Sequence, residues 1–459
     1  MNGAWQRVRA GLRAELAPMF RVAWPVATSE LGWMAMGLVD TMMVGRVSAE
    51  AIGAVSIGAN VFFTVAILGM GMLLGLDYLV AHAVGANRHS DARRALAHGM
   101  YLSLALGVLL TTVVLVLADR LALLGVQPAI ARATAPYLRA MAWSMLPLLL
   151  YTSVRRYLQA VGAVRAVMIA LISANLVNLA VNWILVFGHF GAPALGAEGS
   201  GWATTSARVY LLLFVAAYVA RHERRSGVSL ALYWAFDTTR MRTLLRLGVP
   251  AALQMLLEVG VFAMATLLAG RLSAVQLAAH QIALSAAAFA FMVPLGISSA
   301  AAVRVGYAMG RIDGAGAARA GWTALFLAVA FMSCSAITFV AVPRAIIRVF
   351  TTDAVVIETG TALLGIAAIF ALFDGLQVVA TGVLRGAGDT RSPMLASLVG
   401  YWIIGLPLGY AMCFRHGFGV VGLWIGLSAG LITVAIALMA VWSVRSRELL
   451  RERRIVAAA

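Results

Sequence analysis

Five carboxylic acids stand inside long apolar stretches of the sequence, where an ionised group is expensive. They are Glu30, Asp40, Asp77, Glu258 and Asp374. An ionised carboxylate at the centre of a bilayer costs about 2.5–3.5 kcal/mol on insertion scales. The apolar stretches contain no lysine and almost no arginine, so we expect these acids to lack fixed countercharges and to hold either a proton or a mobile cation. Either state would suit a cation-coupled switch. The alternative is that some of them only cap polar packing seams.

Three of these acids are the predicted cation-coupling residues, namely Glu258, Asp374 and Asp40. Glu258 and Asp374 lie deep in their apolar stretches, and both would be metal ligands if the cation is Na⁺. Asp40 precedes a threonine in the outer half of the first stretch. Asp77 stands near the end of its stretch, where we expect a solvated acid at the membrane surface.

Polar amides and hydroxyls in the same stretches are candidates for binding a substrate. Asn175, Asn178 and Asn182 recur at three- and four-residue spacing, which predicts that they share one helix face. Such residues can also simply hold membrane helices together, at about 0.6 kcal/mol each. The residues that we expect to line a substrate cleft are Asn178, Asn182, Gln281, Ser285 and Glu30.

The composition excludes an ordinary soluble protein. Of the 459 residues, 62% are hydrophobic and 12% are charged, whereas soluble domains average about 45–50% and 25%. All 35 basic residues are arginine, and the absence of lysine excludes a P-loop nucleotide site and a Schiff base. The arginines, which give a net charge of +17, lie between apolar stretches, as topogenic charges do, so no nucleic-acid partner is expected.

The apolar stretches predict an all-α polytopic membrane protein with twelve spans. We expect a cytoplasmic or interfacial N-terminus (1–19), a six-helix bundle (20–220), a cytoplasmic linker (221–243), a second six-helix bundle (244–443) and a basic tail (444–459). The distribution of arginine predicts that both termini are cytoplasmic, with the tail on anionic headgroups. The predicted spans are 20–44, 52–80, 95–118, 137–158, 167–187, 201–220, 245–269, 277–303, 321–342, 361–384, 393–413 and 420–443.

The two halves of the sequence are related. When the second half is aligned on the first without a gap, Pro25 falls on Pro250, and the segment 45–49 (GRVSA) falls on the segment 270–274 (GRLSA). In the same alignment, Glu30 falls one helical turn from Glu258. A slightly longer shift places the segment 158–162 on 384–388. An even number of spans in each half gives a parallel repeat about an axis along the membrane normal. We therefore expect two pseudo-symmetric bundles that face each other across a cleft.

No motif of an enzyme is visible. The sequence contains no HExxH or CxxC pattern, and its seven histidines have no metal-ligand spacing. Cys334 and Cys413 lie in apolar stretches, which does not indicate a disulfide framework. We expect a protein that is not an enzyme and needs no cofactor.

Several segments resemble the motifs of the multidrug and toxic compound extrusion (MATE) family, over about residues 20–440. They are residues 38–46 (LVDTMMVGR), 278–284 (AAHQIAL), 304–306 (RVG), 377–390 (QVVATGVLRGAGDT) and 401–410 (YWIIGLPLGY). The sequence is most similar to the NorM branch. The resemblance implies that Glu258 in the seventh helix and Asp374 in the tenth are coupling residues, and that Asp40 takes part. Asn178 and Asn182 match the amides of the fifth helix, whereas Ser285 and His82 depart from the common Asn and Gln.

The resemblance implies a secondary antiporter that exports organic, often cationic amphiphiles in exchange for inward Na⁺ or H⁺, by rocking of the two bundles. Its partners would be drug-like small molecules and membrane lipids, and we expect a monomer. One alternative is a lipid-linked oligosaccharide flippase of the same superfamily, which should carry cationic residues inside its cleft. A membrane-embedded enzyme, which should show a metal or nucleophile constellation, and a channel, which should show a pore loop, are further alternatives.

Overall fold

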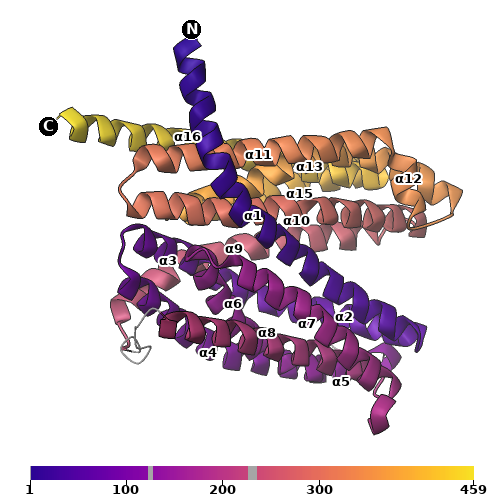
Figure 1. The fold of residues 1–459 in the computed structure, drawn as a ribbon. Helices are drawn as coiled ribbons and strands as arrows, with labels where there is room; N and C mark the ends of the chain where they lie inside the picture. The colour runs from indigo at the N-terminus through magenta and orange to yellow at the C-terminus, as the bar shows by residue number, and fades with distance from the viewer. Residues whose placement is uncertain (1, 122–127, 226–234, 459) are drawn as a thin grey trace. The chain divides into compact units, whose positions relative to one another are not determined.

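The computed structural model describes residues 2–121, 128–225 and 235–458, and within these ranges the chain is helical with no strand (Figure 1). The helices of the first half are α1 (Asn2–Gly45), α2 (Ala49–Met72), α3 (Gly75–Gly85), α4 (His89–Asp119), α5 (Pro128–Ala142), α6 (Met145–Ala160), α7 (Val164–Phe187), the short η2 (His189–Gly191) and α8 (Ala197–Arg225). The helices of the second half are α9 (Thr238–Ala269), α10 (Ala274–Gly310), α11 (Gly314–Ala341), α12 (Pro343–Arg348), α13 (Ala354–Gly386), α14 (Arg391–Ser397), η4 (Leu398–Gly405), α15 (Leu406–Tyr410), η5 (Ala411–Arg415) and α16 (Gly419–Ala458).

The helices form two compact units. Unit N comprises Thr28–Val84 and Arg88–Ala252, and unit C comprises Met1–Ala27, Gly85–Asn87 and Leu253–Ala459. The chain therefore changes unit inside α1, after Ala27, and inside α9, after Ala252. These two positions are equivalent in the internal repeat, since each is the second residue after its helix proline, Pro25 or Pro250. The predicted linker 221–243 lies at the end of α8 and the start of α9, and its residues 226–234 are outside the described part of the chain.

Ten helical segments of the described chain are long and apolar enough to cross a membrane, so the protein is a multi-pass membrane protein. The predicted spans 20–44 and 137–158 are not among them. The first lies within α1, where Glu30 and Asp40 interrupt the apolar residues, and α1 also continues without a break through the predicted N-terminal segment 1–19 from Asn2. The second is divided between α5 and α6 at residues 143–144. The count of twelve spans stays a prediction.

The local geometry confirms the internal repeat. Ser48 caps α2 by accepting a hydrogen bond from the Ala51 N–H at 3.1 Å, and Ser273 caps α10 by accepting one from Gln276 at 3.3 Å. The turns after α6 and α13 each need a left-handed glycine, Gly162 (φ 82°) and Gly388 (φ 81°). The same helix starts and stops therefore recur at positions that the sequence repeat predicts to be equivalent.

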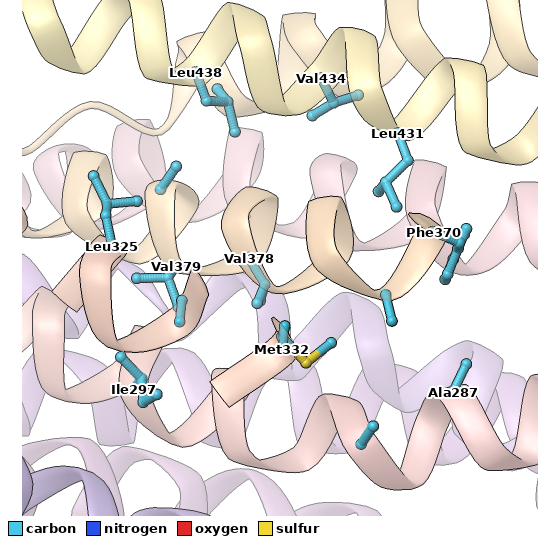
Figure 2. Close-up of a cluster of buried hydrophobic side chains, with 14 of the residues drawn as sticks. Ala287, Ile297, Leu325, Met332, Phe370, Val378, Val379, Leu431, Val434 and Leu438 are labelled. Atoms are coloured by element: carbon cyan, nitrogen blue, oxygen red, sulfur yellow. The ribbon is translucent and has the colours of Figure 1, made fainter. Parts of the chain in front are cut away.

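The core of unit C is built around α13, which carries one of the predicted coupling residues. Figure 2 shows part of this core, in which small and branched side chains from α10, α11, α13 and α16 pack together. Gly382 and Gly386 allow α13 to approach α10 closely. A Cβ atom at Gly382 would lie 2.3 Å from the Ser298 carbonyl oxygen, and one at Gly386 would lie 2.5 Å from the Ala302 carbonyl oxygen. Close backbone approach through small residues is the usual packing of membrane helices, and it fixes α13 against α10.

The core of unit N surrounds α6 and the facing side of α2. Tyr137, Tyr151 and Phe62 are among its largest buried side chains. Gly58 on α2 leaves room for the Tyr137 ring, which a Cβ atom there would approach to 2.4 Å. This packing brings α2, α5, α6 and α8 together and supports the polar groups described next.

Candidate functional site

Unit C places two of the predicted coupling acids on neighbouring helices. Glu258 on α9 accepts a hydrogen bond from Gln254 Nε2 at 2.6 Å, and Gln377 Nε2 on α13 lies 3.5 Å from the same carboxylate oxygen. Gln377 follows Asp374 by about one helical turn. The carboxamide of Gln377 thus links α13 to Glu258, and the two acids interact electrostatically.

Neither acid of this pair has a cationic partner in the described part of the chain. Asp374 is 5% exposed and accepts no hydrogen bond from the described residues. Within the part of the chain that the structure describes, no arginine or histidine lies at ion-pairing distance from Asp374 or Glu258.

The segment η4 contributes two aromatic residues to the surroundings of this pair. It is a π-helical stretch, a local form often found at functional sites. Trp402 donates a hydrogen bond from Nε1 to the Leu257 carbonyl at 3.0 Å, next to Glu258. The Tyr401 side chain is fully buried near both acids, and its hydroxyl has no hydrogen-bond partner among the described residues. Tyr401 and Gln254 were missed as site residues, although Tyr401 opens the motif at residues 401–410 and Gln254 stands one turn before Glu258.

Unit N holds the third predicted coupling acid in a different environment. Asp40 on α1 is 5% exposed and accepts hydrogen bonds from Asn178 Nδ2 at 3.0 Å and Asn182 Nδ2 at 2.7 Å, both to Oδ1. Thr204 Oγ1 on α8 donates to its Oδ2 at 2.6 Å. Asn175 also faces α1, where it donates to the Gly32 carbonyl at 3.1 Å, so the three asparagines share one face as their spacing predicts.

An arginine lies close enough to Asp40 to interact with it. Arg208, one turn after Thr204 on α8, is buried and interacts electrostatically with Asp40 and Tyr137. A buried guanidinium remains positively charged, since arginine is not deprotonated in proteins. The Asp40 site thus combines three donors with a permanent positive charge, neither of which was expected from the sequence.

Two of the five acids have direct ionic partners, which corrects the prediction that they lack countercharges. Glu30 pairs with Arg155, and Asp77 pairs with Arg156 at 3.4 Å. Both arginines are on α6, inside the predicted span 137–158. Successive residues of a helix project about 100° apart, so the two neighbours reach different helices, α1 and α3.

The reading of Asp77 as a solvated surface acid is also wrong. Its side chain is buried, with the whole residue 2% exposed, because Arg156 neutralises it in the interior of unit N. The sequence signal that was missed is the Arg155–Arg156 pair at the end of an apolar stretch.

The remaining predicted cleft residues lie on α10. Ser285 donates a hydrogen bond to the Gln281 carbonyl at 2.8 Å, and the Gln281 side chain is exposed. Neither residue forms a hydrogen bond with Glu258 or Asp374 among the described residues. The described part of the chain contains no group of three or more His, Cys, Asp or Glu side chains that could hold a metal ion.

Comparison with known proteins places the chain in a family. It matches the MatE family twice, over residues 25–184 and 250–411. The two matches begin at Pro25 and Pro250, which are equivalent positions of the internal repeat. The chain belongs to the MATE family of membrane transporters and is not an enzyme.

Relatives and solved structures agree with this assignment. The chain is 37% identical to a probable multidrug resistance protein NorM of Mesorhizobium japonicum over 95% of both chains. It is 38% identical to a multidrug resistance protein NorM of Burkholderia vietnamiensis over 91% of both chains. Among solved structures, a MATE transporter in a bent conformation has a TM-score of 0.87 at 19% identity, covering 96% of this chain and 98% of that chain. A eukaryotic MATE transporter has a TM-score of 0.85 at 20% identity, with 96% and 99% covered. These structural matches show the MATE fold.

Proposed function

We propose that the protein is a secondary antiporter of a bacterial inner membrane, with both termini cytoplasmic, that exports organic and often cationic amphiphiles as inward Na⁺ or H⁺ is taken up. The names of the NorM relatives support drug-like substrates. The observation that carries the coupling is the buried pair Glu258 and Asp374, which has no cationic partner in the described chain.

The chemistry of this pair suits reversible cation loading. Two carboxylates that are close together in a medium of low polarity repel each other when both are ionised and empty. A proton or a sodium ion relieves that repulsion. A cationic substrate does the same, so cation and substrate compete, and by linkage each weakens the binding of the other.

The energy available from one cation is adequate for export. One charge that moves inward through 100 mV releases about 2.3 kcal/mol, and a tenfold cation gradient adds about 1.4 kcal/mol. Together they support a concentration ratio of several hundredfold for a neutral substrate, on the order of 10². Rocking of the two repeats would expose the pair alternately to each side of the membrane.

The residues around the pair are compatible with either cation. Hard cations take oxygen ligands from carboxylates, carboxamides and hydroxyls. The buried Gln377 Oε1 and Tyr401 hydroxyl have no partners among the described residues, and we propose them as additional oxygen ligands if the ion is Na⁺. For H⁺, one of the two carboxyl groups would carry the proton.

We propose a secondary part in coupling for Asp40. Its three donors and the nearby Arg208 already stabilise the ionised form, so an added cation gains less there than at the pair in unit C. Asn178 and Asn182 then contribute to the cleft indirectly, by donating the hydrogen bonds that hold Asp40. For substrate binding we retain Gln281 and Ser285, whereas Glu30 acts through its pair with Arg155.

A flippase for lipid-linked oligosaccharides is the second candidate, because the structure does place arginines inside unit N. Arg155 and Arg156 are neutralised by Glu30 and Asp77. A pyrophosphate would need several uncompensated cations together. Among these buried arginines of unit N, only Arg208 lacks a carboxylate at ion-pairing distance in the described residues. The exporter is therefore the better supported function.

The test is gradient-driven efflux of ethidium from reconstituted vesicles with an imposed Na⁺ or H⁺ gradient. We expect Glu258→Gln and Asp374→Asn each to lower gradient-driven efflux at least about 100-fold, by removing a transport-linked charge worth several kcal/mol. Glu358→Gln is the matched control, since Glu358 is an exposed acid on the same helix as Asp374. Intact efflux in both site variants would exclude the proposal.

A further inference from the structure

The last turns of α8 have one buried face and one face at the surface of the protein. Val215, Val219 and Glu223 recur at four-residue spacing and are buried in unit N. The surface face carries four exposed or half-buried residues at three- and four-residue spacing, namely Ala217, Ala220, Arg221 and Arg224. Two cations and two small apolar side chains therefore lie together on one side of the helix.

The acid in this part of α8 does not neutralise these arginines. Glu223 points into unit N, where it forms an ion pair with Arg93 at 2.7 Å. In the described chain no carboxylate lies at ion-pairing distance from Arg221 or Arg224. The sequence that follows, residues 225–236, contains no acid. The two guanidinium groups are thus available to an anion from outside the chain.

The surface is hollowed at this face. A cavity of about 580 Å³ is lined, among the described residues, by Ala217, Ala220, Arg221 and Arg224. Ligand sites typically enclose about 300–1,000 Å³, so the volume suits the headgroup of an amphiphile and the start of its chain. The lining is apolar at the two alanines and cationic at the two arginines.

The position of this face along α8 indicates the depth at which a ligand would lie. The membrane-spanning segment of α8 is Ala197–Arg224, so both arginines stand at its end. Ala217 and Ala220 come about one turn earlier and lie deeper in the apolar layer. Tyr218 is 37% exposed and stacks on His222 with ring centroids 6.2 Å apart. Exposed tyrosine at the end of a span is typical of the headgroup region.

We propose that Ala217, Ala220, Arg221 and Arg224, which we call the α8 groove, bind an anionic phospholipid. The lipid phosphate lies against the two guanidinium groups, which offer paired N–H donors to it, and an acyl chain lies along the two alanines. Basic pockets at the ends of membrane helices suit anionic headgroups, whereas the ammonium group of a zwitterionic lipid is repelled by two positive charges. The inference goes beyond the export function and does not depend on it.

The test compares two lipids that have the same acyl chains and differ in net charge, phosphatidylglycerol and phosphatidylcholine. Each is titrated into the purified full-length protein in detergent, and native mass spectrometry measures the dissociation constant of each bound lipid. Arg221→Gln combined with Arg224→Gln should weaken one tight phosphatidylglycerol site about 10–30-fold. Binding of phosphatidylcholine should stay within about twofold, and the melting temperature without added lipid shows that the variant is folded.

Three further variants separate the groove from net charge. Arg221→Lys with Arg224→Lys keeps both charges as point charges and should restore most of the affinity. Ala220→Leu keeps both arginines and fills part of the groove, so it should weaken the same site several-fold. Arg344→Gln with Arg348→Gln removes two exposed arginines about one turn apart on α12 and should change neither affinity. If the double glutamine variant does not fold, Ala220→Leu decides the matter.

Unchanged phosphatidylglycerol binding in the double glutamine variant and in Ala220→Leu would overturn the inference. An equal loss in the α12 variant would assign the effect to net charge and overturn it as well. Equal losses of both lipids would refute the selectivity for an anionic headgroup. Inorganic phosphate that displaces phosphatidylglycerol from the wild type at equal concentration would show a site for free phosphate instead of a lipid.

Discussion

The buried acids of the two units differ in the hydrogen-bond donors and positive charges that surround them. In unit N, Asp40 has three hydrogen-bond donors and an arginine nearby. In unit C, Glu258 contacts two carboxamides, whereas Asp374 has no hydrogen-bond donor among the described residues. Neither acid has a cationic neighbour at contact distance in the described residues. A buried carboxylate therefore has three hydrogen-bond donors in the first case, whereas the second case offers only two carboxamides for two carboxylates among the described residues. Position in an apolar helix therefore does not by itself fix the environment of an acid.

The largest expected effect tests this contrast directly. Asp374→Asn should abolish the dependence of dye efflux on the Na⁺ or H⁺ gradient, because it removes half of the uncompensated pair. Asp40→Asn should lower the rate and retain the dependence. The initial rate of efflux, measured across a series of imposed gradients, separates the two outcomes. Loss of the gradient dependence in Asp40→Asn alone would reverse the roles of the units.

Removing a countercharge from unit N should damage stability rather than coupling. Arg155→Met leaves Glu30 buried without its partner, which should lower the free energy of unfolding by about 3–5 kcal/mol. The double variant Arg155→Met with Glu30→Met should recover most of that loss, since it removes both charges. Thermal unfolding in detergent is the measurement. A double variant as unstable as the single one would show that the pair is not what stabilises α1 against α6.

A single donor should matter more at Asp40 than at Glu258. Thr204→Val keeps the side-chain shape and removes the 2.6 Å hydrogen bond to Asp40, so we expect a loss of about 1.5–3 kcal/mol in the free energy of unfolding. Gln377→Leu removes the longer contact of 3.5 Å with Glu258 and should cost less. Denaturation of the two variants side by side provides the comparison, and an equal or opposite order would remove the distinction between the sites.

The smallest effect concerns a charge outside the membrane spans. Asp237 precedes α9, and the Thr239 N–H donates to its Oδ1 at 2.8 Å, which lowers the pKa of Asp237 from its ordinary value. A lowered pKa in the folded state gives stability that is present above the unfolded value of about 3.9 and is lost as the pH falls through the folded value. Asp237→Asn should therefore be slightly less stable than the wild type near neutral pH, with the difference vanishing in acid. Melting temperatures across this pH range test it, and a difference independent of pH would point to the cap geometry instead.

Much of the fold followed from local patterns that depend on neighbouring residues. The internal repeat predicted that residues 45–49 and 270–274 are equivalent, and Ser48 and Ser273 cap the helices that follow them. The three-four spacing predicted that Asn175, Asn178 and Asn182 share one face of their helix, and all three donate hydrogen bonds to α1. Such patterns are local because helix periodicity and caps are set within a few residues. Less was predictable where two chain segments meet. Nothing in the sequence positions of Glu30 and Arg155, which lie far apart along the chain, indicated that they pair.

The sequence by itself determined that this is a helical membrane protein with two related halves and five acids among apolar residues, because composition, hydrophobic runs and repeats are properties of the chain alone. Only the tertiary structure decided which acids are neutralised. It assigned Arg155 to Glu30, Arg156 to Asp77 and the asparagines to Asp40, and it left Glu258 and Asp374 without a cationic partner in the described chain. The electrostatic energy of a buried group depends on charges and donors within a few ångströms, and packing between distant segments sets those distances.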